Sequence, residues 1–214
     1  MNAPTLAELQ LDALTELVNL GVSHAAMSLS ELVREEVFLS VPRVCVVTRD
    51  QAIANLREHD AKRLVGVHQD FDGDIRGRAL LIFPEVRSME LIRALVGAEL
   101  SLDDIMELEQ EALAETGNIL LNGCLSTMAN SLQRSLRISL PEVIHGDGRD
   151  FFGASSAADE TVLFIYINFA VKQRDIQGFL AMILDLPSLV RLQNLLDVYI
   201  ERSTGQGPAT GHVE

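Results

Sequence analysis

The sequence has 214 residues, of which 48% are hydrophobic, enough to form a substantial core in one domain or in two fused halves. Its formal net charge of −14 and the absence of any cluster of Lys and Arg disfavour binding to nucleic acid or to an anionic membrane surface, because both need basic side chains to neutralise phosphates. The two cysteines, Cys45 and Cys124, are far apart and outside any CxxC motif, which indicates neither a disulfide framework nor a zinc site.

The N-terminal segment MNAPTLAELQL lacks the basic residues and the uninterrupted apolar run of a secretory signal peptide. No apolar stretch approaches the roughly 20 residues that a helix needs to span a bilayer. The sequence therefore predicts a cytoplasmic protein without membrane insertion.

In the first half, apolar residues recurring at three- or four-residue steps predict a long helix, and a β-branched strand follows it. Pro42 cannot donate to a β-ladder, so it should lie on an edge or at a bulge. The residues Asp72-Gly73-Asp74 between two apolar runs predict a hairpin turn. The elements expected here are a helix over 5–35, a strand over 37–48, a short helix over 50–58, hairpin strands over 63–71 and 76–83, and a helix over 84–96.

The second half repeats this order. The elements expected are a helix over 102–135, a strand over 136–144, hairpin strands over 161–171 and 176–186, and a helix from 187 to about 200. The stretch 146–160 is poorly periodic, and the segment from Gly146 to Gly153 misses the GxGxxG spacing, which favours a plain loop. Residues 203–214 have no core-forming pattern and should form a flexible tail.

The repeated order predicts an internally duplicated domain. Residues 1–202 are expected to form one domain with repeat halves of about 5–98 and 102–202. The fold class is α/β of the α+β type, with pseudo-twofold symmetry and one largely antiparallel sheet packed with long helices.

A polar motif, acid-x3-Glu-x2-Asn-x22-Pro, occurs once in each half. The first copy consists of Asp12, Glu16, Asn19 and Pro42, and the second, 99 positions later, of Glu111, Glu115, Asn118 and Pro141. Steps of four and three residues return to one side of a helix, so the polar side chains of each copy should form one stripe. Asparagine is a poor residue for a helix interior, and its presence at equivalent places in both halves indicates a chemical role.

The doubled motif resembles the signature of the CheC/CheX/FliY family of chemotaxis response-regulator phosphatases, and the two copies make the chain most like CheC. The surrounding runs LDALTELVNLGVSHAAMSLSELV and ALAETGNILLNGCLSTMANSL are similar to the two family repeats, and the similarity covers most of residues 8–48 and 108–145. The resemblance implies a CheC-like duplicated fold with both motif helices on an exposed face. The first copy departs from the family pattern at Val18, where glycine is usual.

The resemblance implies hydrolysis of the aspartyl-phosphate of a CheY-like response regulator. An asparagine amide offers a donor and an acceptor and stays neutral, so it can orient the attacking water, whereas each glutamate is implied to dock a receiver lysine. The implied site residues are the catalytic Glu16, Asn19, Glu115 and Asn118 and the partner-docking Asp12 and Glu111. No cofactor is expected in the protein itself, because no residues have metal-ligand spacing, and the Mg²⁺ should belong to the receiver domain.

Other interpretations remain open at this point. The chain could be a non-catalytic module, either a phospho-receiver sink like a flagellar-switch component or a docking partner for a CheD-like deamidase. Each polar stripe could also be a solvated helix face, although the doubled motif disfavours that interpretation. The acidic segment from Asp70 to Asp74 lacks the spacing and the distal glutamate of an EF-hand, which favours a hairpin turn over a cation site.

Overall fold

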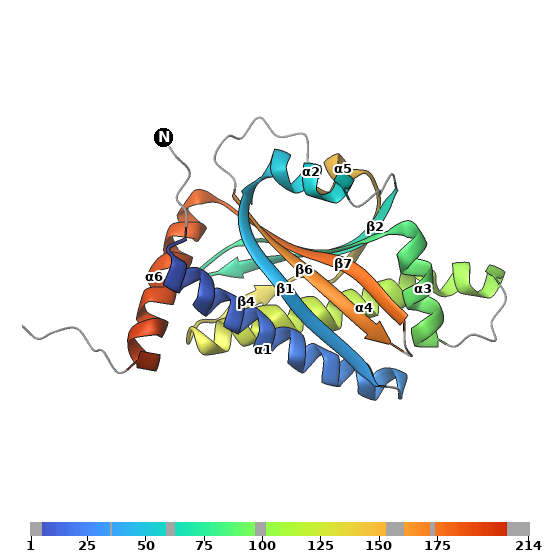
Figure 1. Cartoon of the computed structure of the whole chain (residues 1–214), viewed down its shortest axis with the longest axis horizontal. Helices are drawn as coiled ribbons and strands as arrows, with labels where there is room; N and C mark the ends of the chain where they lie inside the picture. The colour runs from blue at the N-terminus through green and yellow to red at the C-terminus, as the bar shows by residue number, and fades with distance from the viewer. Residues whose placement is uncertain are drawn as a thin grey trace, which may run out of the picture.

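The structure is a computed structural model that describes residues 6–34, 36–58, 63–96, 102–152, 161–171 and 174–204. These residues form helices on both faces of a seven-stranded sheet (Figure 1). The helices are α1 (Glu8–Val33), α2 (Arg49–Glu58), α3 (Glu85–Val96), α4 (Leu102–Ser131), α5 (Gly148–Phe152) and α6 (Leu186–Thr204). The strands are β1 (Val37–Thr48), β2 (Leu64–Gly73), β3 (Gly77–Pro84), β4 (Leu136–Ile138), β5 (Glu142–Gly146), β6 (Thr161–Val171) and β7 (Arg174–Leu184).

The sheet order is β1-β6-β7-β3-β2-β4, and β5 also pairs with β2. All of these pairs are antiparallel. The predicted mixed α+β class, with an antiparallel sheet packed against helices, is therefore confirmed.

Two hydrophobic clusters cover the two faces of the sheet. The larger cluster holds buried residues of α1, α3, α4 and α6, and the smaller holds those of α2 and α5. Successive side chains of a strand point to opposite faces, so Leu81 and Phe83 of β3 join the larger cluster while Leu80 and Ile82 join the smaller. Burial on both faces explains the continuous apolar run of this strand.

Most predicted elements of the first half are confirmed, including the strand 37–48 with its original bounds. β1 lies at an edge of the sheet, and its pairing with β6 shifts register between Ser40 and Arg43, on either side of Pro42. The structure describes the backbone of Pro42 but not its side chain. Both placements expected for a proline in this strand therefore hold, because a residue without an N–H interrupts a ladder least at an edge or a bulge.

In the second half, one helix end, one strand and one loop differ from the predictions. The helix expected to reach residue 135 ends at Ser131, where Gln133 adopts a left-handed φ of 55° and the Arg134 N–H donates to the Ala129 carbonyl (2.8 Å), closing the helix end. The strand expected over 136–144 is two short strands, β4 and β5, separated by Ser139–Pro141. The supposed loop contains α5, whose first turn is capped by an Arg149 N–H bond to Asp147 Oδ1 (2.7 Å).

The two ends of the described chain meet in one hydrogen bond. Gln10, near the start of α1, accepts from the Ala7 N–H (3.0 Å) and donates through Nε2 to Asp197 of α6 (2.7 Å). α6 continues to Thr204, two residues into the predicted tail, where the Thr204 hydroxyl donates to the Ile200 carbonyl (2.9 Å). Residues 205–214 of that tail lie outside the described residues.

Cys45 and Cys124 are free thiols. Burial raises the pKa of the Cys124 thiol to about 12, so it stays protonated and unreactive at neutral pH. Burial also raises the pKa of Cys45, although Arg43 nearby lowers it. Neither thiol has the depressed pKa of a nucleophile.

Candidate active site on the paired helices

The first motif lies along the outer side of α1. Asp12 and Glu16 are exposed and Asn19 is partly buried, whereas Leu17 and Val18 between them are fully buried. The apolar side of this helix faces the larger cluster, which leaves the polar stripe toward solvent. The predicted stripe is therefore present in the first half.

The second motif has the same arrangement on α4. Glu111 and Glu115 are exposed and Asn118 is partly buried, while Leu120 and Leu121 join the larger cluster. The glutamate and the asparagine of this motif thus lie one helical turn apart, with the glutamate further out into solvent.

The two motif helices cross closely and run in opposite directions (Figure 1). A Cβ added at Gly21 of α1 would lie 2.7 Å from the Cα of Cys124, and one added at Gly123 would lie 3.0 Å from the Cβ of Ala25. Glycine at both places lets the two backbones approach.

Each asparagine precedes the crossing on its own helix, so Asn19 and Asn118 lie on opposite sides of it. A rise of 1.5 Å per residue puts them roughly 15 Å apart along the helix axes. The structure therefore presents two separate copies of the motif and does not combine them into one site.

Asn118 is held by two neighbouring amides. Its Oδ1 accepts a hydrogen bond from Nδ2 of Asn122, one turn further along α4 (2.6 Å), and another from Nε2 of Gln69 on β2 (3.3 Å). Gln69 is only 1% exposed, and its Nε2 also donates to the Ser139 carbonyl (2.8 Å). Gln69 therefore connects the helix that carries Asn118 to the segment that precedes Pro141.

That segment is bound tightly to β2. The Ser139 N–H donates to the Asp70 carbonyl (2.9 Å), and the Asp70 N–H donates to the Ser139 hydroxyl (3.0 Å). Pro141 follows two residues later and is partly buried. Asn118 and the segment that precedes Pro141 thus belong to one hydrogen-bonded unit.

Asn19 differs from Asn118. Within the described part of the chain, its side chain makes no hydrogen bond, and the position that corresponds to Asn122 is occupied by the exposed Ser23. The two copies are alike in sequence spacing but unequal in how firmly the asparagine amide is held.

Sequence reasoning missed Gln69 and Asn122. In β2 the residues Val65 and Val67 face the larger cluster, and Gln69 is the next residue on that side, so a polar residue at a buried position was a usable signal. Asn122 follows Asn118 by four residues, the spacing at which helical side chains meet.

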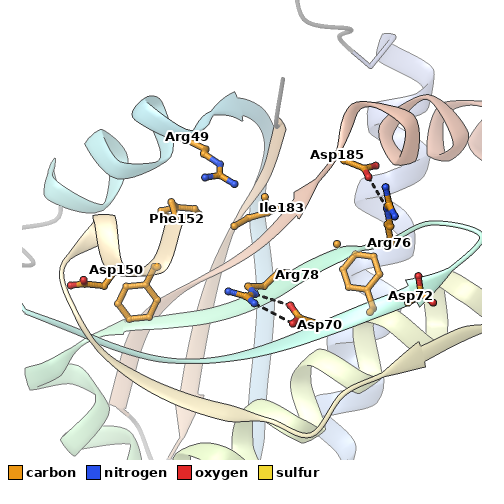
Figure 2. Close-up of a pocket in the computed structure, with 12 residues that line it drawn as sticks. Arg49, Asp70, Asp72, Arg76, Arg78, Asp150, Phe152, Ile183 and Asp185 are labelled. Carbon is orange, nitrogen blue, oxygen red and sulfur yellow. Dashed lines mark hydrogen bonds and ion pairs between the residues drawn. The ribbon is translucent and has the colours of Figure 1, made fainter. Parts of the chain in front are cut away.

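A hollow of about 480 Å³ lies on the other face of the sheet, and none of the motif residues lines it (Figure 2). Arg78 donates to both carboxylate oxygens of Asp70 (2.7 and 3.1 Å), and Arg76 pairs with Asp185 (2.8 Å). The hydrogen bond from Arg78 holds the pKa of Asp70 below its ordinary value. The charges of these two arginines are thus met by adjacent carboxylates, which leaves little attraction for an anionic ligand.

Among the described residues, no group of three or more His, Cys, Asp or Glu side chains has an arrangement that could hold a metal ion. No helix formed by these residues is long and apolar enough to cross a membrane.

Comparison with known proteins shows what this chain is similar to. The profile described as chemotaxis phosphatase CheX matches residues 65–168. The CheY-P phosphatase CheC of Bacillus subtilis is 28% identical to this chain over 152 residues, which is 70% of either protein. The chain is therefore similar to members of the CheC/CheX/FliY family. The resemblance predicted from the doubled motif is confirmed.

Two further proteins are similar to this chain. The putative CheY-P phosphatase CheC1 of Halobacterium salinarum is 27% identical over 142 residues, which cover 66% of this chain and 71% of that protein. The crystal structure of Thermotoga maritima FliY matches with a TM-score of 0.71 at 14% identity, over 92% of this chain and 100% of that one. The FliY likeness shows a shared fold. The CheX profile spans Gln69 and the whole second motif but not the first.

Proposed function

We propose that this chain is a member of the CheC/CheX/FliY family and a phosphatase that hydrolyses the aspartyl-phosphate of a CheY-like response regulator. The observation that carries the proposal is the second motif, in which the exposed Glu115 stands one turn before an asparagine held by two amide donors. The Bacillus subtilis relative, named as a CheY-P phosphatase, supports the same assignment.

The reaction needs few catalytic groups from the protein, because an aspartyl-phosphate is an activated acyl phosphate. Water attacks phosphorus, a new P–O bond forms, and the bond between phosphorus and the carboxylate oxygen of the receiver breaks. The receiver regains a free aspartate, and phosphate leaves with the protons of the water or releases one to solvent. Asn19 and Asn118 orient that water, and this positioning can account for most of the acceleration of hydrolysis.

Glu16 and Glu115 have the docking role in this proposal, with Asp12 and Glu111 framing the same contact. All four carboxylates are exposed on their helices, where a receiver lysine can reach them. The metal in the proposed complex is the receiver's Mg²⁺, and the protein contributes none of its own. A CheD-like deamidase is a further proposed partner.

We also infer that the two halves are copies of one unit. Each long helix is followed by strand, helix, hairpin and helix, and the strand after each long helix pairs with the hairpin of the other half: β1 with β6, and β5 with β2. The second hairpin strands, β3 and β7, pair with each other in the middle of the sheet. A twofold exchange of the halves would preserve all of these pairings.

The test of the proposed function is the half-life of phosphorylated receiver domains from the same organism, measured with and without the protein, together with a binding titration. A phosphatase shortens the half-life of at least one receiver catalytically. A protein that binds the phospho-receiver and leaves its half-life unchanged is the non-catalytic module instead.

The docking role predicts an effect of charge reversal. The double variant Glu16→Lys/Glu115→Lys should bind the phosphorylated receiver about tenfold more weakly, because attraction to a receiver lysine becomes repulsion in a partly desolvated contact. Affinity measured at low and at high salt checks this, since the loss should shrink as salt screens the charges.

The matched control is Glu36→Lys/Glu201→Lys, which changes two exposed glutamates away from the motif and alters the net charge equally. Its affinity should stay within twofold of the wild type. Equal affinities for the wild type and the motif variant would remove the docking role from Glu16 and Glu115.

A further inference from the structure

The hydrogen bonds around Gln69 fix which end of the Asn118 amide faces outward. A backbone carbonyl can only accept, so the end of the Gln69 amide that lies 2.8 Å from the Ser139 carbonyl must be its nitrogen. The same nitrogen lies 3.3 Å from Asn118, whose facing atom must therefore be the acceptor Oδ1. This assignment needs no observed hydrogen, because the carbonyl decides it.

Asn122 adds a second donor to the same oxygen. Its Nδ2 lies 2.6 Å from Asn118 Oδ1, so both acceptor positions of that oxygen are used by the protein. An amide is planar and carries its nitrogen on the other side from its oxygen. Nδ2 of this partly buried side chain therefore points away from β2 and toward the exposed side of α4.

Gln69 is a costly residue for a buried strand position. Its Oε1 is buried and, among the described residues, has no hydrogen-bond partner. A buried acceptor without a partner disfavours folding, and an apolar side chain of similar length would avoid it. Stability alone therefore does not explain a glutamine at this position.

On the basis of the proposed function, we propose that Gln69 and Asn122 are positioning residues that lock the Asn118 amide with Nδ2 toward the phospho-receiver. Nδ2 donates to one lone pair of the attacking water, and the other lone pair is directed at phosphorus. Oδ1 is already occupied, so it takes no proton from that water, whose protons face the phosphoryl oxygens or solvent. The second site thus acts by donation alone.

The first site lacks this lock. No described group holds the Asn19 amide, and the exposed Ser23 stands in the place of Asn122. Among the described residues, no hydrogen bond therefore fixes the orientation of that amide in the free protein. The structure thus gives a physical reason for the second site to be the faster one, in addition to its closer match to the family pattern.

The test measures the second site alone, in an Asn19→Ala background. Gln69→Met and Asn122→Ala should each lower kcat about fivefold, since each removes one bond of roughly 1 kcal/mol that orients the amide, and about 25-fold together. KM for the phospho-receiver should stay within twofold. Asn130→Ala, an exposed position on the same helix, is the control and should leave kcat unchanged.

Two readouts separate positioning from ordinary structural support. The melting temperature of Gln69→Met should stay close to that of the parent while kcat falls, because removal of the unpartnered Oε1 offsets the loss of the bonds from Nε2 to the Ser139 carbonyl and to Asn118. In nitrogen-proton NMR spectra, the Asn118 side-chain NH₂ resonance should shift in Gln69→Met and in Asn122→Ala but not in Asn130→Ala.

An unchanged kcat in the Gln69→Met/Asn122→Ala variant would overturn the inference, as would an unshifted Asn118 resonance. A fall in kcat that merely follows a lower melting temperature would also overturn it, because that is the result of a structural role. Wild-type protein that binds the phospho-receiver without shortening its half-life would instead overturn the proposed function. The NMR comparison would then still decide the amide orientation.

Discussion

The double variant Asn19→Ala/Asn118→Ala should lose nearly all acceleration of receiver dephosphorylation, a fall of at least about 100-fold, while it still binds the phosphorylated receiver. The reason is that each asparagine orients one attacking water, and loss of a positioned polar group at the reacting centre typically costs about 100-fold or more. The measurement is receiver-phosphate half-life with the wild type, each single variant and the double variant, alongside a binding titration.

The fold should survive both substitutions. Each asparagine lies on the outer side of its helix, and alanine is the better helix residue. The single variants divide the activity between the sites, and Asn118→Ala should remove at least half of it. A double variant with full activity would mean that the chemistry lies elsewhere on the molecule.

Much of this arrangement could be predicted from the sequence because its signals are local and strong. Apolar residues at helical spacing predict the motif helices. Pro42 predicts the bulge in β1, because a residue without an N–H cannot donate to the ladder. The outward stripes of Glu16 and Glu115 follow from steps of four and three residues. These features depend on helix and strand geometry alone, so no tertiary contact was needed to infer them.

The contacts across the fold could not be predicted in this way. Gln69 contacts Asn118 only because β2 and α4 pack together, and neither segment has a sequence pattern that predicts this contact. The break at Ser139–Pro141 likewise depends on the bonds of Ser139 to Asp70 on a neighbouring strand. The sequence showed that the two copies differ, because Val18 replaces the usual glycine in the first. It did not show how they differ in structure, where the Asn118 amide is held by two donors and the Asn19 amide has no described partner.

Gly117, next to Asn118, brings α4 unusually close to the sheet. A Cβ at this position would lie 2.5 Å from the Cβ of Val67 and 2.6 Å from its Cγ1. β2 cannot retreat, because it is paired with β3 on one side and with β4 and β5 on the other. A side chain at residue 117 must therefore push the helix away from the strand that carries Gln69.

Gly117→Ala should for this reason lower both stability and activity. Alanine is favoured over glycine in a helix by about 1 kcal/mol, but overpacking a tight core costs about 1–3 kcal/mol, more where the backbone must move, so a net loss of about 2 kcal/mol is expected. The same displacement lengthens the 3.3 Å bond between Gln69 and Asn118, and second-site activity in an Asn19→Ala background should fall roughly tenfold. Urea unfolding and receiver-phosphate half-life measure the two effects, with Ser126→Ala on the exposed side of α4 as the control for helix propensity. A Gly117→Ala protein that is more stable than the wild type would show that propensity outweighs the contact, and that α4 does not rest on Val67 as closely as the structure has it.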